Sequence, residues 1–157
     1  MSSKRTNHRN QVVLWLCAVL VVLGTTGSLA GQKASVIARD AWAREPAPSR
    51  DVTALFVVLE NRGATPRAVV AGETDVADKV ELHEMKMEGS MMRMSPVKQI
   101  EVPAGSLTEL KPGGLHIMIF GLKKRPAVGD VLTVTLTLDD GTKVPVMATV
   151  RRDEVKE

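Results

Sequence analysis

The alternation of apolar and polar residues beyond position 34 predicts short β-strands and no helices. Residues 131–138 alternate threonine with valine and leucine, a β-branched pattern suited to a strand with one dry and one wet face. Residues 52–60 are almost continuously apolar, as in a buried strand. After position 34, no helical period extends over eleven or more residues. The pattern therefore favours an all-β domain.

Turn residues divide this region into eight or nine strands. The sequence Asp139-Asp140-Gly141-Thr142 is a strong hairpin signal between the last two. The expected strands are 35–43, 52–60, 67–71, 79–87, 91–97, 107–110, 115–120, 131–138 and 143–150. Strands at this spacing, without an internal repeat, predict one antiparallel Greek-key sandwich or barrel.

The first 30 residues have the character of a signal peptide. Three basic residues precede the apolar run 12–23, and Ser28-Leu29-Ala30 offers a cleavage site with small residues. The run is shorter than the ~20 residues of a spanning helix, so an uncleaved anchor is the less favoured alternative. Cys17 follows Leu16 instead of a small residue, so we expect no lipid attachment there. We predict an exported or periplasmic domain at 31–157.

The charge balance of the exported part excludes strongly anionic partners. The leader holds three of the 21 basic residues and none of the 18 acidic ones, so both counts are 18 in the remainder. A net charge near zero argues against nucleic acid and against a membrane surface after cleavage. The one cysteine is lost with the leader, so disulfides cannot form. We expect a monomer.

His83, Met94, His116 and Met118 carry the chemistry of this chain. They are spaced as His, ten residues, Met, twenty-one residues, His, one residue, Met. The exported part has two histidines, and both belong to this pattern. Thioethers and imidazoles are ligands expected for Cu(I), and not for magnesium or calcium.

Strand geometry predicts that the first two of these residues are neighbours. In an extended strand, His83, Met85 and Met87 share one face. If Gly89-Ser90 forms a two-residue type II′ turn, Met94 lies opposite Met85. Met94 is then a diagonal neighbour of His83, ~7–8 Å away and within reach of a flexible side chain.

The second strand offers a similar pair. Its aliphatic face should point to the core, so His116 and Met118 point together the other way. Gly113 and Gly114, which follow Pro112, would allow a tight turn into this strand. Two strands can thus each present an imidazole and a thioether to one place.

Several alternatives stay open at this point. Met85, Met87, Met91 and Met92 could be soft core packing or spare thioethers of low affinity. A Zn(II) site could combine both histidines with Glu81 or Glu84, but it would leave the methionines unexplained. A copper buffer without a client and an adhesive β-sandwich are further possibilities. Nothing resembles a nucleophile elbow for Ser–His hydrolysis, so we expect no catalytic residues and no enzyme.

The spacing and its surroundings resemble the PCuAC family of periplasmic copper chaperones. The matching text includes DAWAR at 40–44, VELHEMKM at 80–87, MSPV at 94–97 and LKPGGLHIM at 110–118. The resemblance implies a cupredoxin-like fold that binds one Cu(I) through His83, Met94, His116 and Met118. It also implies delivery to the CuA subunit of cytochrome c oxidase, with Sco-type proteins as possible partners. Some members hold Cu(II) on a His- and Met-containing tail, but residues 151–157 contain neither residue.

Overall fold

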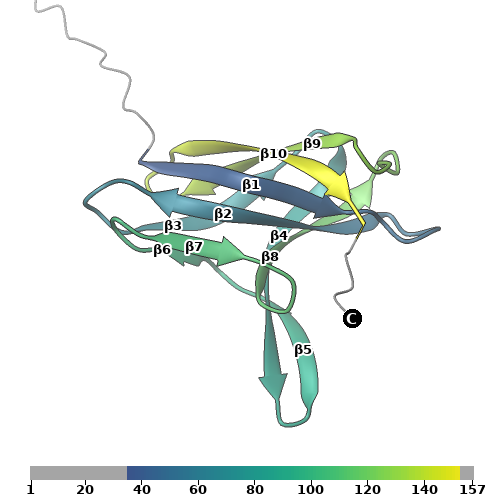
Figure 1. Cartoon of the computed structure of the whole chain (residues 1–157), viewed down its shortest axis with the longest axis horizontal. Coiled ribbons are helices and arrows are strands. Elements are labelled where there is room, and N and C mark those ends of the chain that lie inside the picture. The colour runs from purple at the N-terminus through teal and green to yellow at the C-terminus, as the bar shows by residue number, and fades with distance from the viewer. Residues whose placement is uncertain (1–34, 153–157) are drawn as a thin grey trace, which may run out of the picture. The chain divides into compact units, whose positions relative to one another are not determined.

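The computed structural model describes residues 35–152, which form ten β-strands joined by turns (Figure 1). The strands are β1 (Val36–Arg44), β2 (Val52–Asn61), β3 (Arg67–Glu73), β4 (Ala77–Glu88), β5 (Met91–Pro96), β6 (Ile100–Val102), β7 (Leu107–Leu110), β8 (Leu115–Leu122), β9 (Val131–Leu138) and β10 (Lys143–Arg151). The predicted signal peptide, including Cys17, lies outside the described residues. Within them, no helix could span a membrane.

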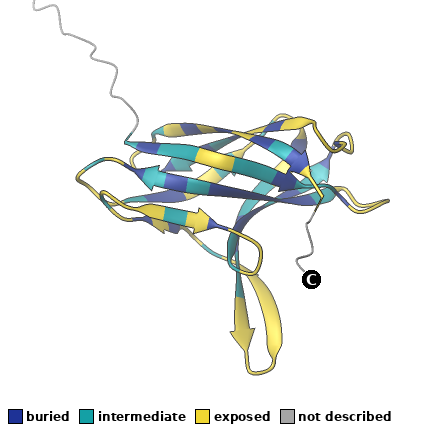
Figure 2. Cartoon of the chain, viewed as in Figure 1, coloured by how far each residue is buried: buried dark blue, intermediate teal, exposed yellow. Residues whose placement is uncertain are grey.

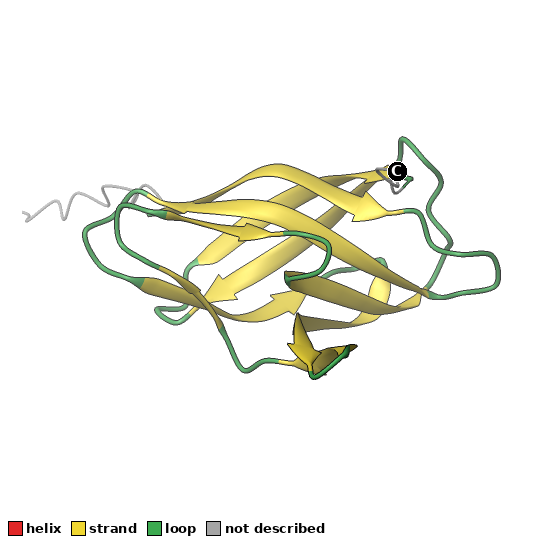
Figure 3. Cartoon of the chain, turned by 60° about the horizontal axis from the view of Figure 1, so that its bottom comes forward, coloured by secondary structure: helices red, strands yellow, loops and turns green. Residues whose placement is uncertain are grey.

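The all-β prediction is confirmed, and the described strands wrap around one core (Figure 3). Hydrogen bonds connect them in the order β5-β4-β8-β2-β1-β10-β9-β3-β6, while β7 pairs with the second half of β2. This path ends at β5 and β6 and does not close into a barrel. The pair β1–β10 is parallel, contrary to the expected purely antiparallel arrangement. These strands lie at opposite ends of the domain sequence, so the rest of the chain supplies the long connection that parallel pairing needs.

Strand number is the second correction, because the structure has ten strands where eight or nine were expected. The missed strand, β6, has only three residues and pairs with β3. Its sequence, Ile-Glu-Val, is too short to show a period. The Asp139–Thr142 hairpin connection is confirmed, with Gly141 at φ 82°.

The core consists of aliphatic side chains from strands along the whole strand order, including β2, β8 and β9. The largest fully buried ones include Leu55, Leu59, Ile117, Ile119, Leu136 and Leu138. On β8 the buried isoleucines alternate with His116 and Met118, as predicted. Burial of Ile117 and Ile119 therefore fixes the face on which the candidate ligands lie.

A β-bulge in β1 preserves the inward and outward pattern of this strand. Between Arg39 and Trp42 the register with β2 shifts by one residue, and Asp40 lies in the left-handed region at φ 53°. The extra residue lets Val36 and Ala43 both point into the core although their spacing is odd. Trp42 is consequently outward, paired with Phe56 of β2.

The β4–β5 hairpin projects from the body of the domain, and its outer half is exposed (Figure 2). Gly89 has φ 63° while Ser90 has a negative φ, which fits the predicted type II′ turn. The register is also as predicted: Met87 pairs with Met92 and Met85 with Met94. Every residue of β5 is exposed.

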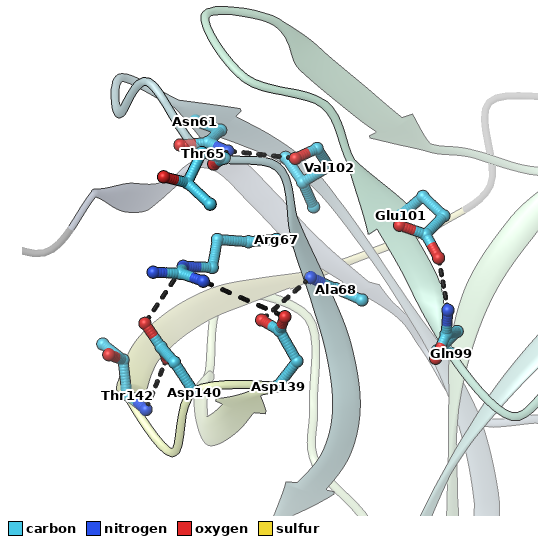
Figure 4. A network of polar contacts seen from close by, with 10 residues as sticks. All are labelled: Asn61, Thr65, Arg67, Ala68, Gln99, Glu101, Val102, Asp139, Asp140 and Thr142. Carbon is cyan, nitrogen blue, oxygen red and sulfur yellow. Dashed lines mark hydrogen bonds and ion pairs between the residues drawn. The ribbon is translucent and has the colours of Figure 1, made fainter.

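A polar network ties β2, β3 and β6 to the β9–β10 turn (Figure 4). The buried Asn61 amide donates to the carbonyls of Thr65, at 2.9 Å, and Val102, at 3.0 Å. Arg67 pairs with Asp140 at 3.0 Å. These contacts satisfy a buried amide and hold β6 against the longer strands.

Gly121, in β8, provides a test of this packing. It has φ 69°, and a Cβ added there would lie 2.9 Å from Asp78 Cβ of neighbouring β4. We expect Gly121→Ala to lower the free energy of unfolding by about 3 kcal/mol, through backbone strain and overpacking together. The matched control is Gly129→Ala, at φ 94°, where a Cβ would have no atom of the described residues within 4 Å apart from its chain neighbours; it should cost about 1 kcal/mol. Urea unfolding would measure both, and equal losses would contradict the steric account.

Candidate metal centre

Three adjacent strands bring the four predicted ligands onto one face of the sheet. His83 is on β4, Met94 is on β5, and His116 and Met118 are on β8. His83 lies directly opposite His116 in the β4–β8 register. Met94 lies opposite Met85, one pair along from His83. Residues up to 35 positions apart in sequence thus become neighbours on one surface.

The two imidazoles form the inner part of this site. Their ring centroids are 5.9 Å apart, and the ring planes are inclined by 46°. His83 is 8% exposed and His116 is 3% exposed. Both histidines therefore lie beneath neighbouring side chains.

Each imidazole uses one ring nitrogen to fix its orientation. His116 Nδ1 donates to the Gly114 carbonyl at 2.9 Å, and His83 Nε2 donates to a Glu81 carboxylate oxygen at 2.8 Å. These bonds assign the tautomers and leave a lone pair on His116 Nε2 and on His83 Nδ1. Among the described residues, both of these buried atoms lack a hydrogen-bond partner. Buried nitrogens without a partner are costly, and a metal ion would satisfy both.

The Gly114 carbonyl connects this orientation to the fold. Besides His116 Nδ1–H, it accepts the Met85 backbone N–H at 3.1 Å, so it joins β4 to the start of β8. Pro112 and Gly113 form the preceding turn, closed by a 3.1 Å bond from Gly114 N to the Lys111 carbonyl. Gly113 has φ 80°, as a type II turn requires at its second central position. This confirms the expected tight turn.

The Glu81 carboxylate accepts the hydrogen bond that orients the His83 ring. Its other carboxylate oxygen lies 2.5 Å from Lys79 Nζ. The Lys79 ammonium, followed by the His83 imidazole, lowers the pKa of this carboxyl, which therefore stays ionised at neutral pH. Sequence reasoning considered Glu81 as a Zn(II) ligand, but the structure places it as the hydrogen-bond partner of a histidine.

The thioethers form the outer part of the site. Met94 is 46% exposed and Met118 is half-buried. Both line a cleft of about 250 Å³, together with His116, Phe56 and Met85. His83 does not line this cleft and adjoins it through His116. The cleft therefore gives solvent access from the methionine side.

The sequence did not reveal that three aromatic residues gather near the histidines. Trp42 packs on Phe56 with ring centroids 4.5 Å apart, and Phe56 lies 6.3 Å from His116. Phe120 lies 6.1 Å from His83. These three are all the aromatic residues beyond position 30. Phe56 and Phe120 thus each place an apolar ring beside one imidazole, and Trp42 supports Phe56.

The sequence profile described as "Putative lipoprotein LpqE-like" matches residues 36–150. The chain belongs to the LpqE-like family. This is the family of PCuAC domains, so the resemblance seen in the sequence is confirmed. A relative from Leifsonia xyli subsp. xyli, named "Putative lipoprotein Lxx21020", is 32% identical and aligns over 89% of this chain and 84% of its own length.

Solved structures of the LpqE-like family share the fold. The Cu(I) form of DR1885 from Deinococcus radiodurans is 31% identical, with a TM-score of 0.58 over 80% of this chain and 85% of that one. The copper-bound PCuAC domain from PmoF2 is 19% identical, with a TM-score of 0.64 over 76% and 94%. The predicted cupredoxin-like fold is thereby confirmed. The copper in these structures is a property of those proteins.

The tautomer of His116 can be tested without a metal. Burial, which outweighs the hydrogen bond to Gly114, lowers the pKa of His116 from its ordinary value near 6.5. We expect ¹⁵N NMR to show neutral His116 as the Nδ1–H tautomer, and its titration midpoint to lie below 6.5. The Nε2–H tautomer would contradict the assigned hydrogen bond, and a midpoint above 6.5 would contradict the dominant effect of burial.

Proposed function

We propose that this protein is an extracytoplasmic Cu(I) carrier that holds the ion between His83, Met94, His116 and Met118. The observation that supports this most strongly is a pair of buried imidazole nitrogens that have no hydrogen-bond partner within residues 35–152, on the same face as two thioethers. The copper-bound structures of LpqE-like relatives support it independently. The ion is cargo, so the proposed role is binding and transfer, without catalysis.

The ligand chemistry favours Cu(I) over Zn(II). In the described part of the chain, no three His, Cys, Asp or Glu side chains come together in a way that could hold a metal ion. An ion bound to both histidines must complete its coordination with other groups, and thioethers suit a soft cation. Four neutral ligands leave the complex with a charge of +1, which disfavours oxidation to Cu(II).

The division between buried imidazoles and exposed thioethers suits a carrier. His83 and His116 would keep the ion out of bulk water, while Met94 offers a partner a place to begin ligand exchange. The ion would leave through the cleft on the methionine side.

The partner we propose is a copper-requiring protein outside the cytoplasm. The leader and the lipoprotein names of the relatives support export, with the periplasm as the proposed compartment. The CuA subunit of cytochrome c oxidase, or a Sco-type protein, is the proposed recipient, and the carrier would act as a monomer. The alternative is a copper buffer that delivers the ion to no particular protein, and the growth experiment below distinguishes it from a carrier.

Substitution of the ligands tests the site. We expect His116→Ala and Met118→Ala each to weaken Cu(I) binding at least ~100-fold, because each removes a ligand, whereas Met91→Ala, on the opposite hairpin face, should change it little. Zn(II) should bind poorly to the unaltered protein. Competition with a chromophoric Cu(I) chelator measures these affinities. Equal losses for all methionines would replace the four-ligand site with a diffuse methionine cluster.

Substitution of Glu81 tests whether the orientation of the His83 ring contributes to Cu(I) affinity. Glu81→Ala should weaken Cu(I) binding ~10-fold, because His83 loses the acceptor that orients its ring. The matched control is Glu84→Ala, which removes a carboxylate paired with Lys86 on the other face and should leave the affinity unchanged. Equal effects would mean that net charge matters and ring orientation does not.

The biological role is tested by growth at different copper concentrations. A strain without this gene should lose cytochrome oxidase activity when copper is scarce and recover it on supplementation, since a carrier matters most when its cargo is limiting. Its tolerance of excess copper should change little. Normal oxidase activity at limiting copper, with greater sensitivity to excess, would instead indicate a buffer.

A further inference from the structure

The β4–β5 hairpin concentrates methionine far beyond what the four-ligand site uses. Five of the eight methionines of the chain lie within residues 85–94. Register places four of them on the face of His83, as two opposed pairs: Met85 with Met94, and Met87 with Met92. The fifth, Met91, lies on the opposite face.

The two faces of the hairpin differ in chemistry. The face that holds Met91 is otherwise polar. It carries two ion pairs, Lys86–Glu84 at 2.7 Å and Arg93–Glu88 at 3.1 Å, and the opposite charges within each pair balance. The face that holds the two methionine pairs carries no charged side chain from Met85 to Met94. On the hairpin itself, a soft cation approaching this face meets thioethers and no charged side chain.

Core packing does not explain the pair nearer the hairpin turn, Met87 with Met92, which we call the outer pair. Met87 is 61% exposed and Met92 is 51% exposed, at the projecting end of the hairpin (Figure 2). Unlike a gap-filling core methionine, neither is enclosed by other side chains. Both thioethers are therefore accessible to an ion from solvent.

The four thioethers can converge on one ion. Directly opposed residues have Cβ atoms ~5 Å apart, and the two pairs are two residues, or ~7 Å, apart along the strands. The centre of this rectangle is then ~4 Å from each Cβ, which an unbranched methionine side chain can span. Such a site needs no imidazole.

We propose that Met85, Met87, Met92 and Met94 form a second, weaker Cu(I) site, through which the ion reaches and leaves the inner site. This rests on the proposed function, because Met94 belongs to both sites. The two sites share Met94, and Met85 lines the cleft beside His116, so an ion can pass between them by exchanging one ligand at a time. Thioethers alone bind Cu(I) more weakly than a set that includes two preoriented imidazoles, so the outer site would fill second. While the first ion holds Met94, the second ion would bind through Met85, Met87 and Met92.

The test is a Cu(I) titration of the exported protein labelled with ¹³C at the methionine methyl groups, followed by NMR. The first equivalent should shift Met94 and Met118. The second should shift Met85, Met87 and Met92, and leave Met91 and Met147 unmoved. These two controls are 67% and 72% exposed, more than either member of the outer pair, so exposure alone would select them first.

The double substitution Met87→Leu/Met92→Leu should lower the affinity for the second ion at least ~10-fold and that for the first less than ~2-fold, while Met91→Leu should alter neither.

The outcomes separate the two proposals. If the second equivalent shifts Met91 and Met147 as much as Met87 and Met92, or shifts no methionine, the outer site does not exist, although the inner one can stand. If the first equivalent leaves Met118 unmoved, the proposed function fails. In that case, shifts confined to the two methionine pairs would still support the outer site as the one place where Cu(I) binds.

Discussion

The register between β4 and β8 is the constraint on which the candidate site depends. It places His83 directly opposite His116 and Glu81 opposite Met118. Because side chains alternate between faces, a slip of one residue would turn His83 towards the core and bring Leu82 or Glu84 to the outer face. Burial of Leu82, Ile117 and Ile119 on the inner face opposes such a slip. The hydrophobic core thus determines which residues form the site on the other side of the sheet.

Hydrogen bonds add a second level of control. The Gly114 carbonyl and the Glu81 carboxylate each take one imidazole N–H, so each ring keeps its lone pair for a ligand. Phe56 lies beside His116 and Phe120 beside His83, while Trp42 packs on Phe56. Together these contacts produce a buried acceptor pair whose energetic cost would be offset by a bound cation. Under the proposed function, that cation would leave past the thioethers, which are more exposed than the imidazoles.

Much of this arrangement could be predicted from local sequence. Gly89-Ser90 set the hairpin register, and the alternation in residues 115–120 placed His116 and Met118 on one face. Long-range features were not accessible in this way. The direct pairing of His83 with His116, the role of Glu81 and the convergence of three aromatic residues all depend on which strands become neighbours. The same holds for the short strand β6 and for the parallel pairing of β1 with β10.

The central claim is that two imidazoles and two thioethers together hold one Cu(I) ion. X-ray absorption at the copper edge, on the protein loaded with one equivalent of Cu(I), tests this most directly, because it counts nitrogen and sulfur neighbours. Our account predicts equal numbers of nitrogen and sulfur scatterers, with the multiple-scattering pattern of imidazole. Replacement of Glu84 should leave this spectrum unchanged. A first shell of sulfur alone, or of nitrogen and oxygen without sulfur, would contradict the account.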